Sequence, residues 1–263
     1  MTGPPPPPEP GGHGLLVGKV ALVTAAAGTG IGSATAARLQ LEGATVVVSD
    51  AHERRLRQRA EALGETAPDG VPPLAVPCDV TVEDQVQALF AAAVERHGRI
   101  DVVVNNAGLG GTAELVDMTD EQWHKVVDVT LTGTFRCTRA ALRRLCPQGS
   151  GVIVNNASVL GWRAQAGQAH YAAAKAGVMA LTRSAAVEAA PSGVRVNAVA
   201  PSLAMHPFLA KVTSDELLDE LAAREAFGRP AEPWEVATVI AFLASDYSTY
   251  MTGEVVSVSS QHP

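Results

Sequence analysis

Residues 19–50 read KVALVTAAAGTGIGSATAARLQLEGATVVVSD, and this stretch decides the predicted fold. It begins with an uninterrupted apolar run, residues 19–24, which is typical of a strand buried on both faces. Gly28, Gly30 and Gly32 then lead into an Ala- and Leu-rich pattern, which predicts a tight turn opening a helix. Backbone N–H groups at such a helix start face anions such as pyrophosphate. A plain tight turn is the alternative, but a second apolar strand, residues 44–50, favours a dinucleotide site.

Asp50 ends this second strand at the spacing expected of a ribose-binding acid. Its carboxylate can accept hydrogen bonds from both ribose hydroxyls and would repel a 2′-phosphate. The sequence therefore favours NAD over NADP. His52, Arg54 and Arg55 follow directly and could soften this preference, although at a helix start they are expected to face solvent.

Strand-like and helix-like segments alternate along the remainder of the chain. The strands are too apolar to face water, so we expect an α/β fold with a doubly wound parallel sheet and helices on both faces. Thr81 is predicted to cap one helix, Thr119 and Gln122 to form a capping box for another that runs to about Cys146, and Pro233 to begin a third. The further expected strands lie in residues 73–80, 100–108, 151–158, 194–202 and 252–260.

Composition restricts the class of protein and of partner. The chain has 263 residues, 47% of them hydrophobic and 18% charged, with a net charge of −7. It has no apolar run of about 18 residues, so no transmembrane helix is expected. The negative charge argues against nucleic acid or an anionic membrane as partner and favours small molecules. Three cysteines without a CxxC pair indicate a reduced, cytoplasmic protein, and no metal is expected.

Residues 1–14, MTGPPPPPEPGGHG, differ from the rest of the chain. This Pro/Gly-rich segment lacks the apolar centre of a signal peptide and is predicted to be a disordered, polyproline-like tail with no share in the chemistry. Residues 15–263 are then expected to form a single domain.

The candidate chemical groups lie between residues 151 and 188. Tyr171 and Lys175 are four positions apart in an Ala-rich helical segment, so they share one helix face. A neighbouring ammonium would bring the pKa of a tyrosine down from about 10 toward neutrality. Ser158 ends the preceding strand and can hydrogen-bond a substrate oxygen. Each residue alone is more often a turn serine, a helix-flank tyrosine or a solvated lysine, but the chain has only three tyrosines in all.

The order Ser158, Tyr171, Lys175 resembles the active site of the short-chain dehydrogenase/reductase family, and the resemblance extends over residues 15–260. It implies a single-domain Rossmann fold with a seven-stranded sheet, an NAD(P) cofactor and a homotetramer, with a dimer as the alternative. It also implies hydride transfer with Tyr171 as general acid or base, Ser158 polarising the substrate oxygen, and Lys175 binding the nicotinamide ribose and tuning the tyrosine.

The same resemblance assigns cofactor contacts by position. Besides Tyr171 and Lys175, these are Thr24, Ala26, Gly28, Gly30, Ile31, Gly32, Asp50, Asp79, Val80, Asn105, Ala107, Gly108, Pro201, Ser202, Leu203 and Ala204. Asn105 is expected either beside the ligand or as a brace between strands.

The chain departs from the family pattern at several of these places. Ala26 replaces the first glycine of the turn, with one extra residue after Thr24. Thr130 stands where an Asn usually serves the proton relay, Ser202 replaces a glycine, and His206 replaces a threonine that holds the carboxamide. We therefore expect a remodelled cofactor turn and an altered or main-chain relay.

The whole-chain phrasing resembles a bacterial subgroup near the dehydrogenases of sterol-ring breakdown and the 3-oxoacyl reductases. The predicted substrate is the hydroxyl or ketone of a bulky alicyclic acid or its CoA ester, with a 3-oxoacyl thioester as the alternative. Residues 202–229 are expected to form a lid with a capping box at 213–216. Its apolar residues either line a substrate pocket or merely pack the lid helix; they are Leu203, Met205, Phe208 and Leu209. Arg163, His206 and Lys211 nearby are compatible with an anionic tail on an apolar ring.

Two other classes of protein are alternatives. A non-catalytic dinucleotide sensor or scaffold would account for the altered turn but would not require the Ser/Tyr/Lys set. A nucleotide-sugar epimerase or dehydratase would need a larger substrate domain than the roughly 60 residues after the sixth strand can build.

Overall fold

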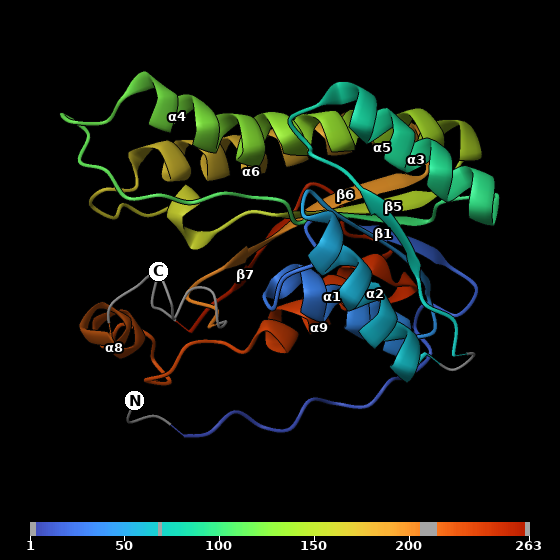
Figure 1. Cartoon of the computed structure of the whole chain (residues 1–263), viewed down its shortest axis with the longest axis horizontal. Helices are drawn as coiled ribbons and strands as arrows, with labels where there is room; N and C mark the ends of the chain where they lie inside the picture. The colour runs from blue at the N-terminus through green and yellow to red at the C-terminus, as the bar shows by residue number, and fades with distance from the viewer. Residues whose placement is uncertain (1–3, 68–69, 206–214, 261–263) are drawn as a thin grey trace.

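The strands of the computed structural model, which describes residues 4–67, 70–205 and 215–260, form one parallel sheet (Figure 1). Its seven strands run in the order β3-β2-β1-β4-β5-β6-β7. Their bounds are β1 Val20–Val23, β2 Thr45–Asp50, β3 Leu74–Pro77, β4 Val102–Asn105, β5 Gly151–Asn156, β6 Val194–Pro201 and β7 Val255–Val258. The strand order changes direction at β1, so the doubly wound α/β prediction is confirmed.

Helices cover both faces of this sheet (Figure 1). One layer contains α1 Ile31–Leu41, α2 Glu53–Thr66 and α9 Pro233–Ala244. The other contains α3 Glu83–His97, α4 Asp120–Val127, α5 Gly133–Gln148 and α6 Ala169–Ala189. The remaining described helices are α8 Asp215–Ala223, the π-turn η1 Asp128–Thr132, and the 3₁₀ turns η2 Val159–Gly161, η3 Ala190–Ser192 and η4 Asp246–Ser248.

Adjacent residues of the central strands enter different hydrophobic cores. Val23 and Val48 pack toward α1, α2 and α9, whereas Leu22 and Val47 pack toward α3 and α5, and all four side chains are fully buried. Because successive strand residues face opposite sides, burial on both faces requires the uninterrupted apolar runs that the sequence contains.

Helix ends agree with most of the local signals. Thr119 and Gln122 form the expected capping box, and Pro233 is the first residue of α9. The prediction for Thr81 is wrong, because α3 begins at Glu83 after Val82. The Thr81 hydroxyl instead donates a hydrogen bond to Asp79 Oδ1 (2.8 Å), so its side chain is taken up by the preceding turn.

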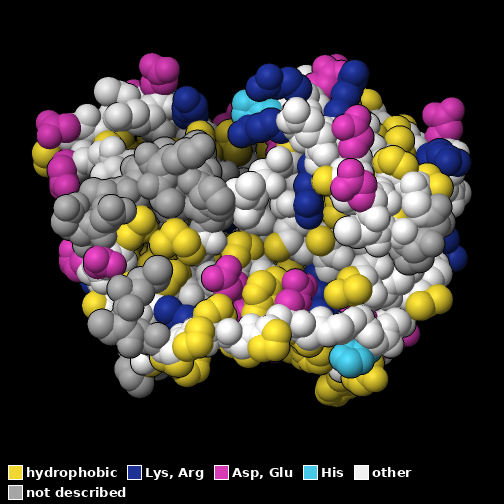
Figure 2. All heavy atoms as spheres, turned by 60° about the horizontal axis from the view of Figure 1, so that its bottom comes forward, with side chains coloured by type: hydrophobic (Ala, Val, Ile, Leu, Met, Phe, Trp, Pro, Cys, Tyr) yellow, Lys and Arg dark blue, Asp and Glu magenta, His cyan; other side chains and the backbone are white. Residues whose placement is uncertain are grey.

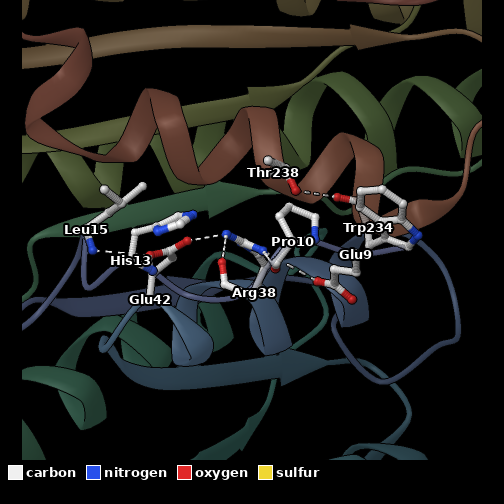
Figure 3. Close-up of polar contacts among 9 residues, drawn as sticks. Glu9, Pro10, His13, Leu15, Arg38, Glu42, Trp234 and Thr238 are labelled. Carbon is white, nitrogen blue, oxygen red and sulfur yellow. Dashed lines mark hydrogen bonds and ion pairs between the residues drawn. The ribbon is translucent and has the colours of Figure 1, made fainter. Parts of the chain in front are cut away.

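The N-terminal segment contains no helix or strand over its described part, but its backbone is bound to α1 (Figure 3). Arg38 and Glu42, 2% and 0% exposed, form an ion pair one turn apart. Arg38 donates to the carbonyl oxygens of Pro10 and Gly11, and Glu42 accepts from the N–H groups of His13 and Leu15. Burial alone would raise the pKa of Glu42, but these hydrogen bonds and Arg38 hold it below its usual value.

The described surface carries charges of both signs. Figure 2 shows Lys and Arg side chains gathered in the upper middle of the face that it presents, with Asp and Glu beside them, and hydrophobic side chains along its lower edge. None of the described helices is long and apolar enough to cross a membrane. All three cysteines are free thiols, and within the described ranges no group of His, Cys, Asp and Glu side chains is placed to hold a metal ion.

Candidate active site

The Ser/Tyr/Lys set lies where β5 and α6 meet. Ser158 follows β5 by two residues and caps η2, with its Oγ accepting from Leu160 N–H (3.2 Å). Tyr171 and Lys175 lie in the first two turns of α6, which packs against β6. Ser158 lies close enough to the Tyr171 hydroxyl to lower the pKa of the tyrosine, and Lys175 Nζ lies 5.5 Å from the centroid of the tyrosine ring. The structure therefore brings the three predicted groups together.

Burial controls the protonation of this set. It raises the pKa of Tyr171 to about 12, partly offset by the hydrogen bond with Ser158. It lowers the pKa of Lys175 to about 8. The expectation that Lys175 brings the tyrosine pKa toward neutrality is contradicted, because burial has the largest effect on the pKa of Tyr171 and the offsetting effect comes from Ser158. At neutral pH the phenol carries its proton.

Lys175 and Thr130 both lie close to Gly108. A side chain at Gly108 would come within 3.3 Å of Lys175 Nζ and 3.8 Å of Thr130 Oγ1. Lys175 Nζ donates to the main-chain oxygen of Asn156 (2.5 Å). Thr130, inside the π-turn between α4 and α5, accepts from Leu109 N–H (2.9 Å) and donates to Leu109 O (3.1 Å). The threonine hydroxyl therefore holds the segment after β4, and its part in a proton relay stays a prediction.

The glycine turn opens α1 without a side-chain cap. Gly30 is the N-cap residue, and no side chain accepts from the first N–H groups of the helix. A Cβ at Gly28 would meet only Gly30 N, at an ordinary contact distance of 3.9 Å. These free N–H groups suit a pyrophosphate, so the chain fits a dinucleotide at this point. The Thr24 hydroxyl accepts from the N–H groups of Asn106 and Ala107 and thereby ties the turn to the end of β4.

Asp50 lies beside this turn at the end of β2. Its carboxylate accepts from Ala27 N–H (3.2 Å) and His52 N–H (2.9 Å). Burial raises its pKa, partly offset by the Ala27 hydrogen bond and by Arg55. Arg54 and Arg55 are exposed, as expected. Asp50 is thus held against the turn at the end of its strand, where the ribose was predicted.

Several other assigned contacts are engaged within the protein. Asp79 Oδ1 accepts from Thr81, and Val80 is buried against Gly133. Asn105 is 2% exposed and its Nδ2 donates to Thr138 and Asn155. Of the two roles expected for Asn105, the structure gives it the strand brace.

The segment after β6 is bound to β7 and to the residues between α8 and α9. Ser202 N–H donates to Val258 O (3.2 Å) and Leu203 N–H to the Glu225 carboxylate (3.4 Å). Ala204 pairs with Ala231. The main-chain N–H of Leu203, one of the assigned cofactor contacts, is therefore hydrogen-bonded within the protein. His206, Phe208, Leu209, Lys211 and the capping box at 213–216 lie outside the described residues or involve side chains that are not described.

Sequence reasoning missed two amide side chains. Asn106 Nδ2 donates to the main-chain oxygens of Thr24 and Ala25, and Asn156 Nδ2 donates to Asn106 Oδ1. The only signal in the sequence is that each follows another asparagine at the end of an apolar strand.

At the carboxyl ends of the strands, the structure has free N–H groups at the start of α1, the Asp50 carboxylate beside them, and the Tyr171 phenol near the Ser158 hydroxyl. This arrangement defines a dinucleotide-dependent dehydrogenase or reductase. A family model described as enoyl-(acyl carrier protein) reductase matches residues 25–260. The chain belongs to the short-chain dehydrogenase/reductase family, whose members bind a nicotinamide dinucleotide and act on hydroxyl or ketone groups.

Similar proteins confirm the predicted subgroup, which lies near ring-degradation dehydrogenases and 3-oxoacyl reductases. The chain is 66% identical over 259 residues, 98% of each sequence, to (5R,7aS)-5-hydroxy-7a-methyl-1-oxo-2,3,5,6,7,7a-hexahydro-1H-indene-carboxyl-CoA reductase of Mycobacterium tuberculosis. It is 41% identical to the 3-oxoacyl-[acyl-carrier-protein] reductase FabG of Thermotoga maritima, covering 92% of this chain and 97% of that one. A crystal structure of a short chain dehydrogenase from Mycobacterium smegmatis superposes with a TM-score of 0.86 at 60% identity, covering 98% of both chains.

Proposed function

We propose that this protein interconverts a secondary alcohol and a ketone on a bulky alicyclic acid or its CoA ester, with NAD as cofactor. The observation that carries the chemistry is that Ser158 and the buried Lys175 both lie beside Tyr171. The relative that reduces a bicyclic carboxyl-CoA, at 66% identity, supports the substrate class.

In the reduction direction, Tyr171 gives its proton to the ketone oxygen while hydride reaches the carbonyl carbon. The bound nicotinamide supplies that hydride. A tyrosine with a pKa near 12 is protonated at neutral pH and is therefore ready as a general acid. Ser158 donates a hydrogen bond to the same oxygen, and Lys175 returns a proton to the tyrosine after each turnover. Alcohol oxidation runs the same steps in reverse.

Asp50 supports NAD over NADP. Its carboxylate is already desolvated beside the glycine turn, so a 2′-phosphate placed there would meet a buried like charge. Arg54 and Arg55 are solvent-exposed beyond it. The measurement is the Kd for NADH and NADPH by titration calorimetry, and a tighter Kd for NADPH would contradict this assignment.

The apolar character of the segments near the active site supports an alicyclic substrate. Trp162, just after Ser158, and Leu115 and Val116, in the segment after β4, expose 49%, 67% and 92% of their surface. Exposed hydrophobic side chains of this size commonly mark a binding surface. Residues 202–229 are proposed as the lid over them.

A panel of substrates tests the proposal, with oxidation or reduction of the nicotinamide followed by absorbance. We expect turnover with bicyclic and cyclohexane hydroxy acids and their CoA esters. Preference for linear 3-oxoacyl thioesters would favour the alternative reductase that the FabG likeness supports. Cofactor binding without hydride transfer to any member would favour a sensor or scaffold.

We also propose a cytoplasmic homotetramer, with a dimer as the alternative. Large hydrophobic side chains on α4, α5 and α6 are exposed in the single chain, namely those of Trp123, Phe135 and Val187. Light scattering coupled to gel filtration measures the molar mass against 27.2 kDa for one chain.

A further inference from the structure

The chain leaves β1 through a strained residue. Ala25 has φ +52°, and it is the only non-glycine residue with positive φ in the described part of the chain. An L-residue disfavours this left-handed conformation, so surrounding contacts must hold it. Ala25 lies in the remodelled turn, three residues before Gly28.

Asn106 provides the holding contact. Its Nδ2 donates to the main-chain oxygens of Thr24 (3.3 Å) and Ala25 (3.1 Å). The fit is tight, because a side chain at Gly32 would come within 2.3 Å of both Ala25 O and Asn106 Nδ2. The Asn106 amide is therefore packed between the turn and the first turn of α1.

Asn156 determines which way the Asn106 amide faces. Asn156 Nδ2 donates to Asn106 Oδ1 (2.9 Å), so that oxygen must point to β5 and Nδ2 to the turn. Asn156 Oδ1 is buried and accepts no hydrogen bond from the described residues, so Asn156 contacts Asn106 through its donor group. The main-chain oxygen of the same residue accepts from Lys175 Nζ (2.5 Å).

We propose that Asn156 is a positioning residue that joins the cofactor turn to the catalytic lysine. Through its side chain it fixes Asn106 and hence the strained Ala25, and through its main chain it fixes Lys175. A displacement of the cofactor turn or of Lys175 is therefore transmitted to the other through the end of β5. The inference rests on the proposed function, since it assigns the turn to NAD.

The variant Asn156→Ala removes the donor and frees Asn106 to rotate. We expect the Kd for NADH to rise about tenfold, the usual effect of leaving one buried hydrogen-bonding group unpaired, and kcat to fall. In the cofactor-free protein, amide hydrogen exchange in residues 24–28 should become faster. The matched control is Thr182→Val, which removes the acceptor of the neighbouring Asn155 amide (2.9 Å). It should lower Tm without changing the Kd or that exchange.

A rescue variant separates positioning from general damage. Glycine adopts positive φ without strain, so Ala25→Gly makes the turn less dependent on its brace. In the Asn156→Ala background it should restore most of the lost NADH affinity, whereas added to Thr182→Val it should change the Kd little.

Two results would overturn the inference. A wild-type Kd together with unchanged exchange in Asn156→Ala would overturn it, and so would failure of Ala25→Gly to restore binding. A wild-type protein that binds no NADH would overturn the proposed function instead, and the exchange rates of the cofactor-free variants would still decide whether Asn156 holds the turn.

Discussion

At the scale of the residue, the Tyr171 hydroxyl is the group on which the proposed chemistry depends. Replacing Tyr171 by Phe removes the proton donor and leaves the ring in place. Loss of a general acid or base typically lowers a rate about 10²- to 10⁴-fold. We expect kcat to fall by that amount, while the Kd for NADH changes little. Turnover measured with a substrate that the wild type accepts, beside calorimetric binding, checks this. Near-wild-type turnover would contradict the assigned role.

The lysine gives the reaction a pH dependence. The pKa of Lys175 is lowered to about 8 by burial, so its ammonium is present below pH 8 and lost above it. Proton return to Tyr171 during ketone reduction needs the ammonium. The kcat for reduction should therefore be flat below about pH 7 and fall as pH rises through 8. A profile that stays flat to pH 10 would show that Lys175 does not supply the proton.

Sequence spacing was sufficient to find Ser158, Tyr171 and Lys175, because a helix turn and a strand end fix their directions. It was insufficient for their protonation, since desolvation depends on which other elements pack around α6. It was also insufficient for Asn106 and Asn156. Their contact joins residues 50 positions apart and exists only because β4 and β5 are neighbours in the sheet.

At the scale of the element, strands were predictable to within a few residues because burial on both faces leaves an apolar run. The π-turn η1 could not be predicted, because Asp128–Thr132 has an ordinary helical sequence pattern. In the structure, Thr130 inside this turn accepts a hydrogen bond from Leu109 N–H, a contact that the sequence pattern does not indicate. The attachment of the N-terminal segment to α1 was missed for a similar reason. Proline and glycine predict no element, but backbone groups can still bind a buried ion pair.

The Arg38–Glu42 ion pair should stabilise α1 and the N-terminal segment attached to it. Replacing Glu42 by Gln keeps the shape but leaves Arg38 as a buried cation without its partner. We expect the free energy of unfolding at pH 7 to fall by about 3 kcal/mol, as for other broken buried pairs. Urea unfolding measures it, and Glu53→Gln, which breaks an exposed pair with Arg57, should change it by less than about 1 kcal/mol.

The contribution of the Arg38–Glu42 ion pair to stability depends on pH. Because the folded-state pKa of Glu42 is depressed, its contribution is fully present above the unfolded pKa, about 4.3. It is lost as pH falls through the lower folded value. The difference between wild type and Glu42→Gln should therefore shrink below about pH 4, and a difference that grows on acidification would contradict the assignment.

At the scale of the whole molecule, the cofactor should act on the entire sheet, because its predicted contacts come from the carboxyl ends of β1, β2, β4, β5 and β6. A ligand that binds only the folded chain at 100 times its Kd adds about 2.7 kcal/mol of stability. For a chain of this size that corresponds to a rise in Tm of roughly 5–10 °C. We expect this rise with NADH and a smaller one with NADPH at equal concentration. Asp50→Ser should narrow the difference by removing the carboxylate that is proposed to face the ribose, and an equal rise with both cofactors in the wild type would show that Asp50 does not select between them.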